Sequence, residues 1–207
     1  MTENKIVHVV DDDADVRDSI CALLDAEGLR RRGYASALQF LGVASEADGC
    51  AVLDIRMPGM DGMDLQARLK AGGVNLPLIF VTGHGDTQLA VKAMKAGALD
   101  FIEKPFSDTE LIAAVRRALD VGAAQRERNQ KRDGAEKMVA GLTPREREVL
   151  AELVDGHPNK IVAYHLKISP RTVEIHRANI MAKLEARNLS DLVRIALSAG
   201  VESTGGS

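Results

Sequence analysis

The chain has 207 residues, of which 45% are hydrophobic and 28% charged, and its formal net charge is −3. These values are typical of an ordinary globular protein and exclude a collagen-like or low-complexity chain. No apolar stretch approaches the roughly 20 residues that cross a membrane, and no N-terminal segment has the form of an export signal. We therefore expect a cytoplasmic protein, with no membrane partner, that folds as one large or two small domains.

The first part of the chain alternates short apolar segments with helical patterns. The predicted strands lie at 6–10, 29–34, 51–54, 76–82 and 100–102, and the predicted helices at 14–27, 36–44, 62–71, 86–97 and 107–124. Such alternation builds a parallel sheet with helices on both faces. We therefore expect an α/β N-terminal domain at 1–121 with a doubly wound, five-stranded parallel sheet. Cys21 and Cys50 fall inside these patterns, which favours small buried thiols over a disulfide.

The composition changes after residue 121. The segment 122–138 has good helix formers but almost no apolar stripe, so we expect a helical linker that extends the preceding helix and frays at Gly134. The charge changes too: residues 1–120 hold 13 basic and 19 acidic side chains, whereas residues 121–207 hold 14 and 11. An acidic part joined to a basic part suggests two tasks, the second on a polyanion.

The segment 139–201 predicts an all-α domain with clear helix starts. Thr143-Pro144-Arg145-Glu146 is a capping box with proline at the first helical position, and Ser169-Pro170 repeats the signal. The predicted helices begin after Thr143, span 159–166 and 171–184, and open again at Ser190. Short helices with a tight turn before Ser169 are what a helix-turn-helix module needs. A flexible tail is predicted at 202–207.

Charged side chains follow the ends of three predicted strands. Asp11 and Asp12 follow the first, Asp54 ends the third and Lys104 follows the fifth. The carboxyl ends of parallel strands meet at one edge of the sheet, where ligands bind. Two carboxylates at ~4 Å repel by roughly 4 kcal/mol at an effective dielectric near 20. A divalent cation removes this repulsion, and Mg²⁺ prefers such oxygen ligands.

These residues fit phosphoryl transfer. Asp54 is the natural nucleophile, because a carboxylate can attack phosphorus to give an aspartyl phosphate. Lys104 can bind the phosphoryl group as a point charge, and Thr82, at the end of the fourth strand, can donate to a phosphate oxygen. Each residue alone has an ordinary explanation: Asp11–Asp13 as a helix N-cap cluster, with Asp13 capping a helix from residue 14, Lys104 as a solvated lysine and Phe101 as core. Their joint placement at successive strand ends favours the site.

Four motifs in this part resemble those of response-regulator receiver domains, which have a flavodoxin-like fold. They are Val-Val-Asp-Asp at 9–12, Leu-Asp-Ile-Arg-Met-Pro-Gly-Met-Asp-Gly at 53–62, Val-Thr-Gly at 81–83 and Lys-Pro-Phe at 104–106. The resemblance implies that Asp54 is the phosphoacceptor. It also implies that Asp12 binds Mg²⁺ directly, that Asp11 assists through water and that the backbone carbonyl of Arg56 completes the ligands. A cis Lys104-Pro105 bond, and a Phe101 that turns inward when Thr82 moves, are implied as well.

The predicted helix at 171–184 has two faces. At 100° per residue, Val173, Ile180 and Leu184 fall on one side and are expected in the core. The other side is expected to approach base edges through Arg171, Thr172, Glu174, Ile175 and Ala178. Phosphate contacts are expected from Lys160, Arg177 and Lys183. The ordinary alternative is a solvated charged face. For His176 we favour packing or a phosphate contact over a metal role, because no Cys/His cluster accompanies it.

Motifs in the second part resemble the LuxR-type output domain. They are Leu-Thr-Pro-Arg-Glu-Arg-Glu-Val-Leu at 142–150, Asn-Lys-Ile-Val-Ala at 159–163, Ile-Ser-Pro-Arg-Thr-Val-Glu-Ile-His-Arg at 168–177, Ala-Lys-Leu at 182–184 and Asp-Leu-Val-Arg at 191–194. The whole chain thus resembles the NarL/FixJ subfamily of response regulators. The resemblance implies a sequence-specific transcriptional regulator, expected to be an activator, that a sensor histidine kinase phosphorylates. Its implied partners are promoter DNA, RNA polymerase and a second copy of the chain.

The resemblance places the dimer contacts on the helix at 86–97 with the strand at 100–103, and on the helix at 190–198. Among the residues of the first face, we expect apolar contacts from Ala90, Val91, Met94 and Ala98. We expect no enzyme activity beyond the chain's own Mg²⁺-dependent phosphotransfer and dephosphorylation. A haloacid-dehalogenase-like phosphatase is the main rival, but that chemistry needs a second acid two residues after the nucleophile, where this chain has Arg56. A second rival keeps the receiver and gives the helices an RNA or protein target.

Overall fold

The computed structural model describes residues 5–83 and 87–201. The described chain divides into two compact units between Gln125 and Arg126. The predicted tail at 202–207 and the first residue of the helix predicted at 86–97 lie outside the described residues. Among the described residues, no helix is long and apolar enough to cross a membrane.

The first unit is built on a five-stranded parallel sheet in the order β2-β1-β3-β4-β5. Its strands are β1 (Ile6–Val10), β2 (Arg30–Tyr34), β3 (Gly49–Asp54), β4 (Leu78–Thr82) and β5 (Asp100–Glu103). The chain leaves β1 for one edge and later returns to add β3 on the other side, so the winding direction reverses between β1 and β3. Ligands bind at such a reversal, outside the carboxyl ends of the strands. The predicted doubly wound α/β fold is confirmed.

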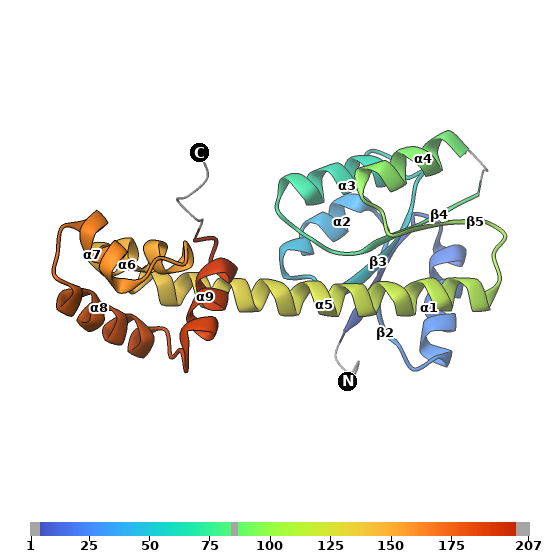
Figure 1. Ribbon diagram of the computed structural model, residues 1–207. Helices are drawn as coiled ribbons and strands as arrows, with labels where there is room; N and C mark the ends of the chain where they lie inside the picture. The colour runs from blue at the N-terminus through green and yellow to red at the C-terminus, as the bar shows by residue number, and fades with distance from the viewer. Residues whose placement is uncertain (1–4, 84–86, 202–207) are drawn as a thin grey trace. The chain divides into compact units, whose positions relative to one another are not determined.

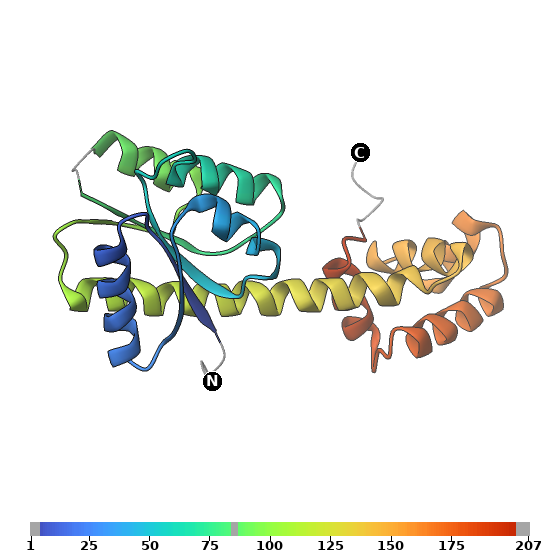
Figure 2. The ribbon, with the colours of Figure 1, turned by 180° about the vertical axis from the view of Figure 1, so that it is seen from behind.

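Helices cover both faces of this sheet, α1 and α5 on one and α2, α3 and α4 on the other (Figures 1 and 2). Their bounds are Ala14–Ala26 for α1, Ala37–Leu41 for α2, Gly62–Ala71 for α3, Thr87–Ala96 for α4 and Asp108–Ala140 for α5. The helix predicted at 36–44 is wrong in its extent. It ends at Leu41, and a separate 3-10 turn spans Ala44–Glu46.

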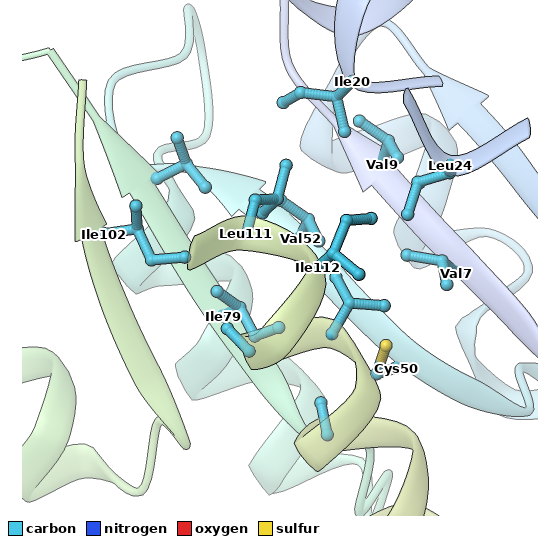
Figure 3. Close-up of a cluster of buried hydrophobic side chains, with 14 of the residues drawn as sticks. Val7, Val9, Ile20, Leu24, Cys50, Val52, Ile79, Ile102, Leu111 and Ile112 are labelled. Atoms are coloured by element: carbon cyan, nitrogen blue, oxygen red, sulfur yellow. The ribbon is translucent and has the colours of Figure 1, made fainter. Parts of the chain in front are cut away.

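Each face of the sheet carries its own hydrophobic core. On one face, Val7, Val52 and Ile79 pack beneath Leu24 of α1 and Leu111 of α5 (Figure 3). The alternate strand residues point to the other face, where Leu53 and Phe80 pack with Phe40 and Leu65. Burial on both faces explains why these strands are continuous apolar runs instead of alternating ones. Cys21 and Cys50 are free buried thiols, and burial raises the pKa of Cys50 to about 12.

The expectation that the linker frays at Gly134 is wrong, because α5 continues as one helix to Ala140. A glycine inside a helix costs roughly 0.5–1 kcal/mol relative to alanine, so other contacts must offset it. Ala135 is buried, and Val139 packs against the core of the second unit. Surface ion pairs one turn apart add a little, namely Glu127–Lys131 and Arg132–Glu136.

The second unit has a small core between short helices: α6 (Pro144–Val154), α7 (Asn159–Leu166), α8 (Pro170–Lys183) and α9 (Leu189–Ser198). The core includes Leu150, Val173, Ile180, Leu184 and Leu192, all fully buried. The capping box of Thr143 and Glu146 is confirmed. The last helix starts one residue before the predicted Ser190, because the Asn188 side chain caps it by accepting a bond from the amide of Asp191.

Gly62, the first residue of α3, gives a test of how tightly this helix packs behind β3. A Cβ at Gly62 would lie 2.4 Å from the backbone oxygen of Asp54 and 3.0 Å from Cε1 of Phe80. We expect Gly62→Ala to lower the free energy of unfolding by roughly 1–3 kcal/mol, because the backbone must shift. Urea denaturation of the full chain measures this change.

Gly134→Ala is the matched control. A Cβ at Gly134 meets open space within α5, so this variant should be neutral or stabilised by up to about 1 kcal/mol. Equal behaviour of the two variants would contradict the close packing described for α3.

Candidate functional site

The strand register brings the predicted site residues to one edge of the sheet. Val10 pairs with Leu53, so Asp11 follows β1 beside Asp54 at the end of β3. Asp54 pairs in turn with Val81, so Thr82 is next on β4, and Lys104 follows β5. Asp11 and Asp54 are only 3% and 8% exposed to solvent, and Thr82 is 2% exposed. The edge therefore holds two buried carboxylates and a buried hydroxyl.

Lys104 joins the two buried carboxylates. Its ammonium Nζ donates to Oδ2 of Asp11 at 2.9 Å and to Oδ1 of Asp54 at 3.0 Å. Its backbone amide donates to the carbonyl oxygen of Thr82 at 2.7 Å, which fixes the start of the loop after β5. The bond from Lys104 to Pro105 is cis, as the receiver resemblance implies. We expected a divalent cation to offset the carboxylate repulsion; the lysine already offsets part of it.

The surroundings of Asp54 balance the negative charge of its carboxylate only in part. Burial raises the pKa of Asp54, and the negative charge of Asp11 raises it further; the hydrogen bond and charge of Lys104 oppose both effects only in part. The amide of Arg56 also donates to Oδ2 of Asp54 at 2.7 Å. Burial lowers the pKa of Lys104, but its bonds to the two carboxylates outweigh this and raise it overall. One ammonium facing two carboxylates leaves a net negative charge at this edge, which favours an additional cation.

The available donors fit a hard divalent cation. Asp11 and Asp54 supply carboxylate oxygens from inside the edge, and Asp12 is exposed at the rim. Oxygen donors of this kind suit Mg²⁺, which keeps several waters and takes one or two carboxylates. Asp13 has a different role, since its carboxylate accepts from the amides of Asp15 and Val16 and caps α1 as predicted.

The outward face of α8 is the second candidate site. Val173, Ile180 and Leu184 are buried as predicted, and the opposite face is solvent-exposed at Arg171, Glu174, Ile175 and Ala178. The guanidinium of Arg171 lies 3.4 Å from the carboxylate of Glu174, with 84% of the Arg171 side chain exposed. Ile175 is 52% exposed on the same face.

Three of the predicted phosphate-binding side chains lie in different settings. Lys160 is exposed at the start of α7. Lys183 donates to Oε2 of the buried Glu146 at 2.7 Å, and Arg177 donates to Oδ1 of Asn159 at 2.7 Å. The side chains of Lys183 and Arg177 thus already make hydrogen bonds within the second unit.

Two further side chains of α8 are partly buried. Thr172 exchanges a hydroxyl bond with Ser169 at 2.8 Å. The Nδ1 of His176 is buried and has no hydrogen-bond partner among the described residues, which fits packing.

The face formed by α4 and β5 matches the expectation only in part. Val91 and Met94 are each 47% exposed. Ala98 was expected on this surface, which is wrong: it is buried in the core on the α2–α4 side of the sheet, since it lies beyond the end of α4, where the chain turns into β5. Phe101 is half-buried against the same core, on the strand next to Thr82.

Sequence reasoning missed a third cluster. Neither His157 nor His165 was considered as a metal ligand from the sequence, whereas Glu152, His157 and His165 bring their ligand atoms within 4.8 Å of one another. The signal in the sequence was weak, because His157 precedes the short helix α7, His165 lies in the last turn of α7 and Glu152 belongs to α6.

Family comparisons cover most of both units. Residues 7–116 match the response regulator receiver domain, and residues 140–196 match the bacterial regulatory proteins of the luxR family. The transcriptional regulatory protein FixJ of Azorhizobium caulinodans is 50% identical over 202 residues, or 97% of this chain and 96% of the relative. FixJ of Rhizobium meliloti is 47% identical over 196 residues, or 94% of this chain and 96% of the relative.

Solved structures agree with these relatives. The low-resolution structure of the response regulator StyR is 41% identical with a TM-score of 0.81, covering 93% of this chain and 98% of that one. Full-length FixJ from B. japonicum is 43% identical with a TM-score of 0.58, covering 96% and 98%.

The bond between Lys183 and Glu146 predicts a pH dependence of stability. Hydrogen bonds from Lys183 and from the Thr143 backbone lower the pKa of Glu146 to about 2, from an ordinary value near 4.5. The ionised carboxylate therefore stabilises the fold above the unfolded-state pKa, and this contribution is lost as the pH falls from about 4.5 to about 2. We expect Glu146→Gln to be less stable than the unmodified chain at pH 7. Thermal unfolding should show the difference in unfolding midpoint shrinking as the pH falls from about 4.5 to about 2.

Glu148→Gln is the matched control on the same helix. Glu148 is exposed and pairs with Arg145 at the surface, so its replacement should change stability by no more than about 0.5 kcal/mol. A margin for Glu146→Gln that stays constant down to pH 2 would contradict the assignment.

Proposed function

Because the chain belongs to the response regulators that join a receiver domain to a LuxR-type DNA-binding domain, we propose that Asp54 is its phosphoacceptor. Such regulators control transcription in response to phosphorylation by a sensor kinase. The observation that supports Asp54 is the bridge from Lys104 to the buried carboxylates of Asp11 and Asp54. We place the receiver domain at 1–121, the helical linker at 122–138 and the DNA-binding domain at 139–201.

Phosphoryl transfer needs an exposed lone pair on Asp54 and compensation of charge on the phosphoryl oxygens. One oxygen of Asp54 attacks phosphorus as the bond to the kinase histidine breaks, and the histidine nitrogen leaves with that electron pair. The amide of Arg56 and the ammonium of Lys104 hold the carboxylate in place. Mg²⁺, when bound by Asp11, Asp12, Asp54 and the carbonyl of Arg56, would neutralise charge on the transferring group. The same site would support the slow hydrolysis of the acyl phosphate.

Thr82 would couple phosphorylation of Asp54 to a change in the face formed by α4 and β5. Its hydroxyl is buried one residue beyond the pair of Asp54 with Val81, within reach of a group attached to Asp54. Movement of Thr82 toward a phosphoryl oxygen vacates space that the half-buried Phe101 on β5 takes up. The face of α4 and β5, with Val91 and Met94 exposed, then becomes a surface for dimerisation.

Dimerisation matters for DNA because each copy brings one α8. Two recognition helices about one DNA turn apart, ~34 Å, contact two half-sites of a promoter. Binding of the first recognition helix to its half-site raises the effective concentration of the second helix at the other half-site. Arg171 and Glu174 are placed to contact bases and Lys160 to contact phosphate, whereas Lys183 and Arg177 contribute less because Glu146 and Asn159 already bind them. α9 pairs the DNA-bound copies, and contact with RNA polymerase makes the regulator an activator.

Replacement of Asp54 tests the phosphoacceptor. We expect Asp54→Asn to abolish the hydroxylamine-sensitive label that a small acyl-phosphate donor places on the unmodified chain, because an amide cannot form an acyl phosphate. Asp64→Asn, at an exposed position of α3, should label normally. Chelation of divalent cations should also stop labelling.

Undiminished labelling of Asp54→Asn removes Asp54 from this role, and labelling that survives chelation contradicts the metal site. Turnover of small phosphomonoesters by the unmodified chain would favour the phosphatase class instead.

Replacement of Arg171 tests the recognition helix. We expect Arg171→Ala to weaken binding to a selected duplex site by ~1–3 kcal/mol relative to random DNA, because a base contact is lost. Lys160→Ala, which removes a phosphate contact, should weaken both duplexes equally and reduce the salt dependence. Gel-shift titrations of the unmodified chain and of both variants, each on both duplexes, measure these affinities.

Equal losses on both duplexes for Arg171→Ala would make it a phosphate contact. Tighter binding to matched RNA than to duplex DNA would overturn the promoter assignment.

A further inference from the structure

A compact cluster of two imidazoles and a carboxylate lies in the second unit, apart from the outward face of α8. Oε2 of Glu152 lies 2.8 Å from Nδ1 of His157 and 2.8 Å from Nδ1 of His165. The two imidazole rings are 5.1 Å apart and nearly perpendicular, at 88°. Among the described residues, this is the cluster whose three ligand atoms all lie within 4.8 Å. Three atoms that can bind a metal ion are therefore gathered in one place.

The backbone fixes two of the three side chains. Gly156, which follows the C-cap residue of α6, has the left-handed conformation, with φ +80°, and its amide donates to the carbonyl of Leu153 at 3.1 Å. The amide of His157 then donates to the carbonyl of Glu152 at 3.1 Å. These paired bonds form a Schellman motif, which turns the chain back over the last turn of the helix. His157 is thus held against Glu152 by helix capping, independently of the side-chain bond.

The third side chain is fixed by packing. Val162 and Ala163 of α7 are buried in the core that α6 also lines, which sets the position of α7 against α6. His165 lies in the last turn of α7, whereas His157 precedes the first turn. The two histidines therefore reach Glu152 from opposite ends of α7. The cluster therefore joins the end of α6 to the residue before the N-cap of α7 and to the last turn of α7.

We propose that Glu152, His157 and His165 form a binding site for a divalent transition-metal ion of the Zn²⁺ type. Two imidazole nitrogens and one carboxylate oxygen are a ligand set that Zn²⁺ uses, with the remaining position left to water. The side chains of His157 and His165 are 35% and 41% exposed, and that of Glu152 is 15% exposed, so water can reach the ion. The nitrogen donors distinguish this site from the oxygen-only edge of the sheet, which suits Mg²⁺.

The distances require only a small adjustment. Ligand atoms around a tetrahedral Zn²⁺ at about 2.0–2.1 Å stand roughly 3.3–3.4 Å from one another. The two contacts of 2.8 Å must therefore open by about half an ångström, which exposed imidazoles achieve by side-chain rotation. Without metal, each Nδ1–H donates to the carboxylate; with metal, the ring proton resides on Nε2 and the Nδ1 lone pair binds the ion.

Occupation of the site would reinforce the helix-turn-helix. α7 packs directly on α8, and the ion would tie α7 to α6 at both of its ends. Any ion that binds the folded chain and not the unfolded one raises the unfolding midpoint. We therefore expect Zn²⁺ to stabilise the second unit without any contribution from the phosphoacceptor site.

Calorimetric titration of the full chain with ZnCl₂ tests the proposal. The chain is first stripped with chelator, and excess Mg²⁺ is kept present so that the oxygen site is occupied. One Zn²⁺ should bind per chain at the cluster. His157→Asn and His165→Gln should each weaken binding by about tenfold or more, since even loss of a residue that only orients a ligand costs this much. Glu148→Gln, an acid on the same helix outside the cluster, should bind as the unmodified chain does.

A second measurement needs no substitution. The imidazole nitrogen resonances of the unmodified chain should show two rings changing from the Nδ1–H to the Nε2–H tautomer when Zn²⁺ is added, and Asp54→Asn should show the same change. Absence of saturable binding in Mg²⁺, unaltered affinity in both histidine variants, or unchanged tautomers would overturn the proposal and leave a hydrogen-bonded clasp between α6 and α7.

Discussion

Two buried carboxylates share one ammonium at the carboxyl edge of the sheet, and the chemistry of this edge follows from that constraint. Parallel pairing of β1 with β3 brings Asp11 and Asp54 together, and Lys104, which follows β5, binds both carboxylates. Burial raises the pKa of Asp54, so its ionised form has a cost that the lysine meets only in part. An edge with an uncompensated negative charge attracts cations, which is the property that a metal-assisted phosphoacceptor requires.

The fold was predictable where one physical signal dominated. Buried parallel strands are short continuous apolar runs, and β1, β3, β4 and β5 fit this form. The sequence signal for β2 was weaker, because β2 is an edge strand. Its residues Arg30, Arg31 and Arg32 are exposed, and of its five residues only Tyr34 is buried. The length of α5 was missed because local composition around Gly134 favours fraying, whereas Ala135 is buried and Val139 packs against the core of the second unit. Contacts between segments distant in sequence override local propensity.

The same distinction applies to the candidate sites. The strand-end rule placed Asp11, Asp54, Thr82 and Lys104 together because sheet topology alone determines their proximity. Helical periodicity separated the buried and exposed faces of α8 but gave no information on partners. Lys183 binds Glu146 of α6, and the cluster of Glu152 with its two histidines needs a helix cap and a helix packing contact at once. Pairings of this kind depend on tertiary structure, which periodicity does not encode.

Lys104 is also the element through which, on the proposed mechanism, phosphorylation changes the edge. An ammonium has three N–H donors, and two are bound to Asp11 and Asp54. A phosphoryl group brings about −1.5 to −2 charges and three strong acceptor oxygens, so it competes for these donors and for the hydroxyl of Thr82. A modification shifts an equilibrium only through interactions that differ between the two states. Thr82 is the buried donor whose partner would change, and its carbonyl already accepts from Lys104, so one exchange of hydrogen bonds would alter β4 and the start of the loop after β5 together.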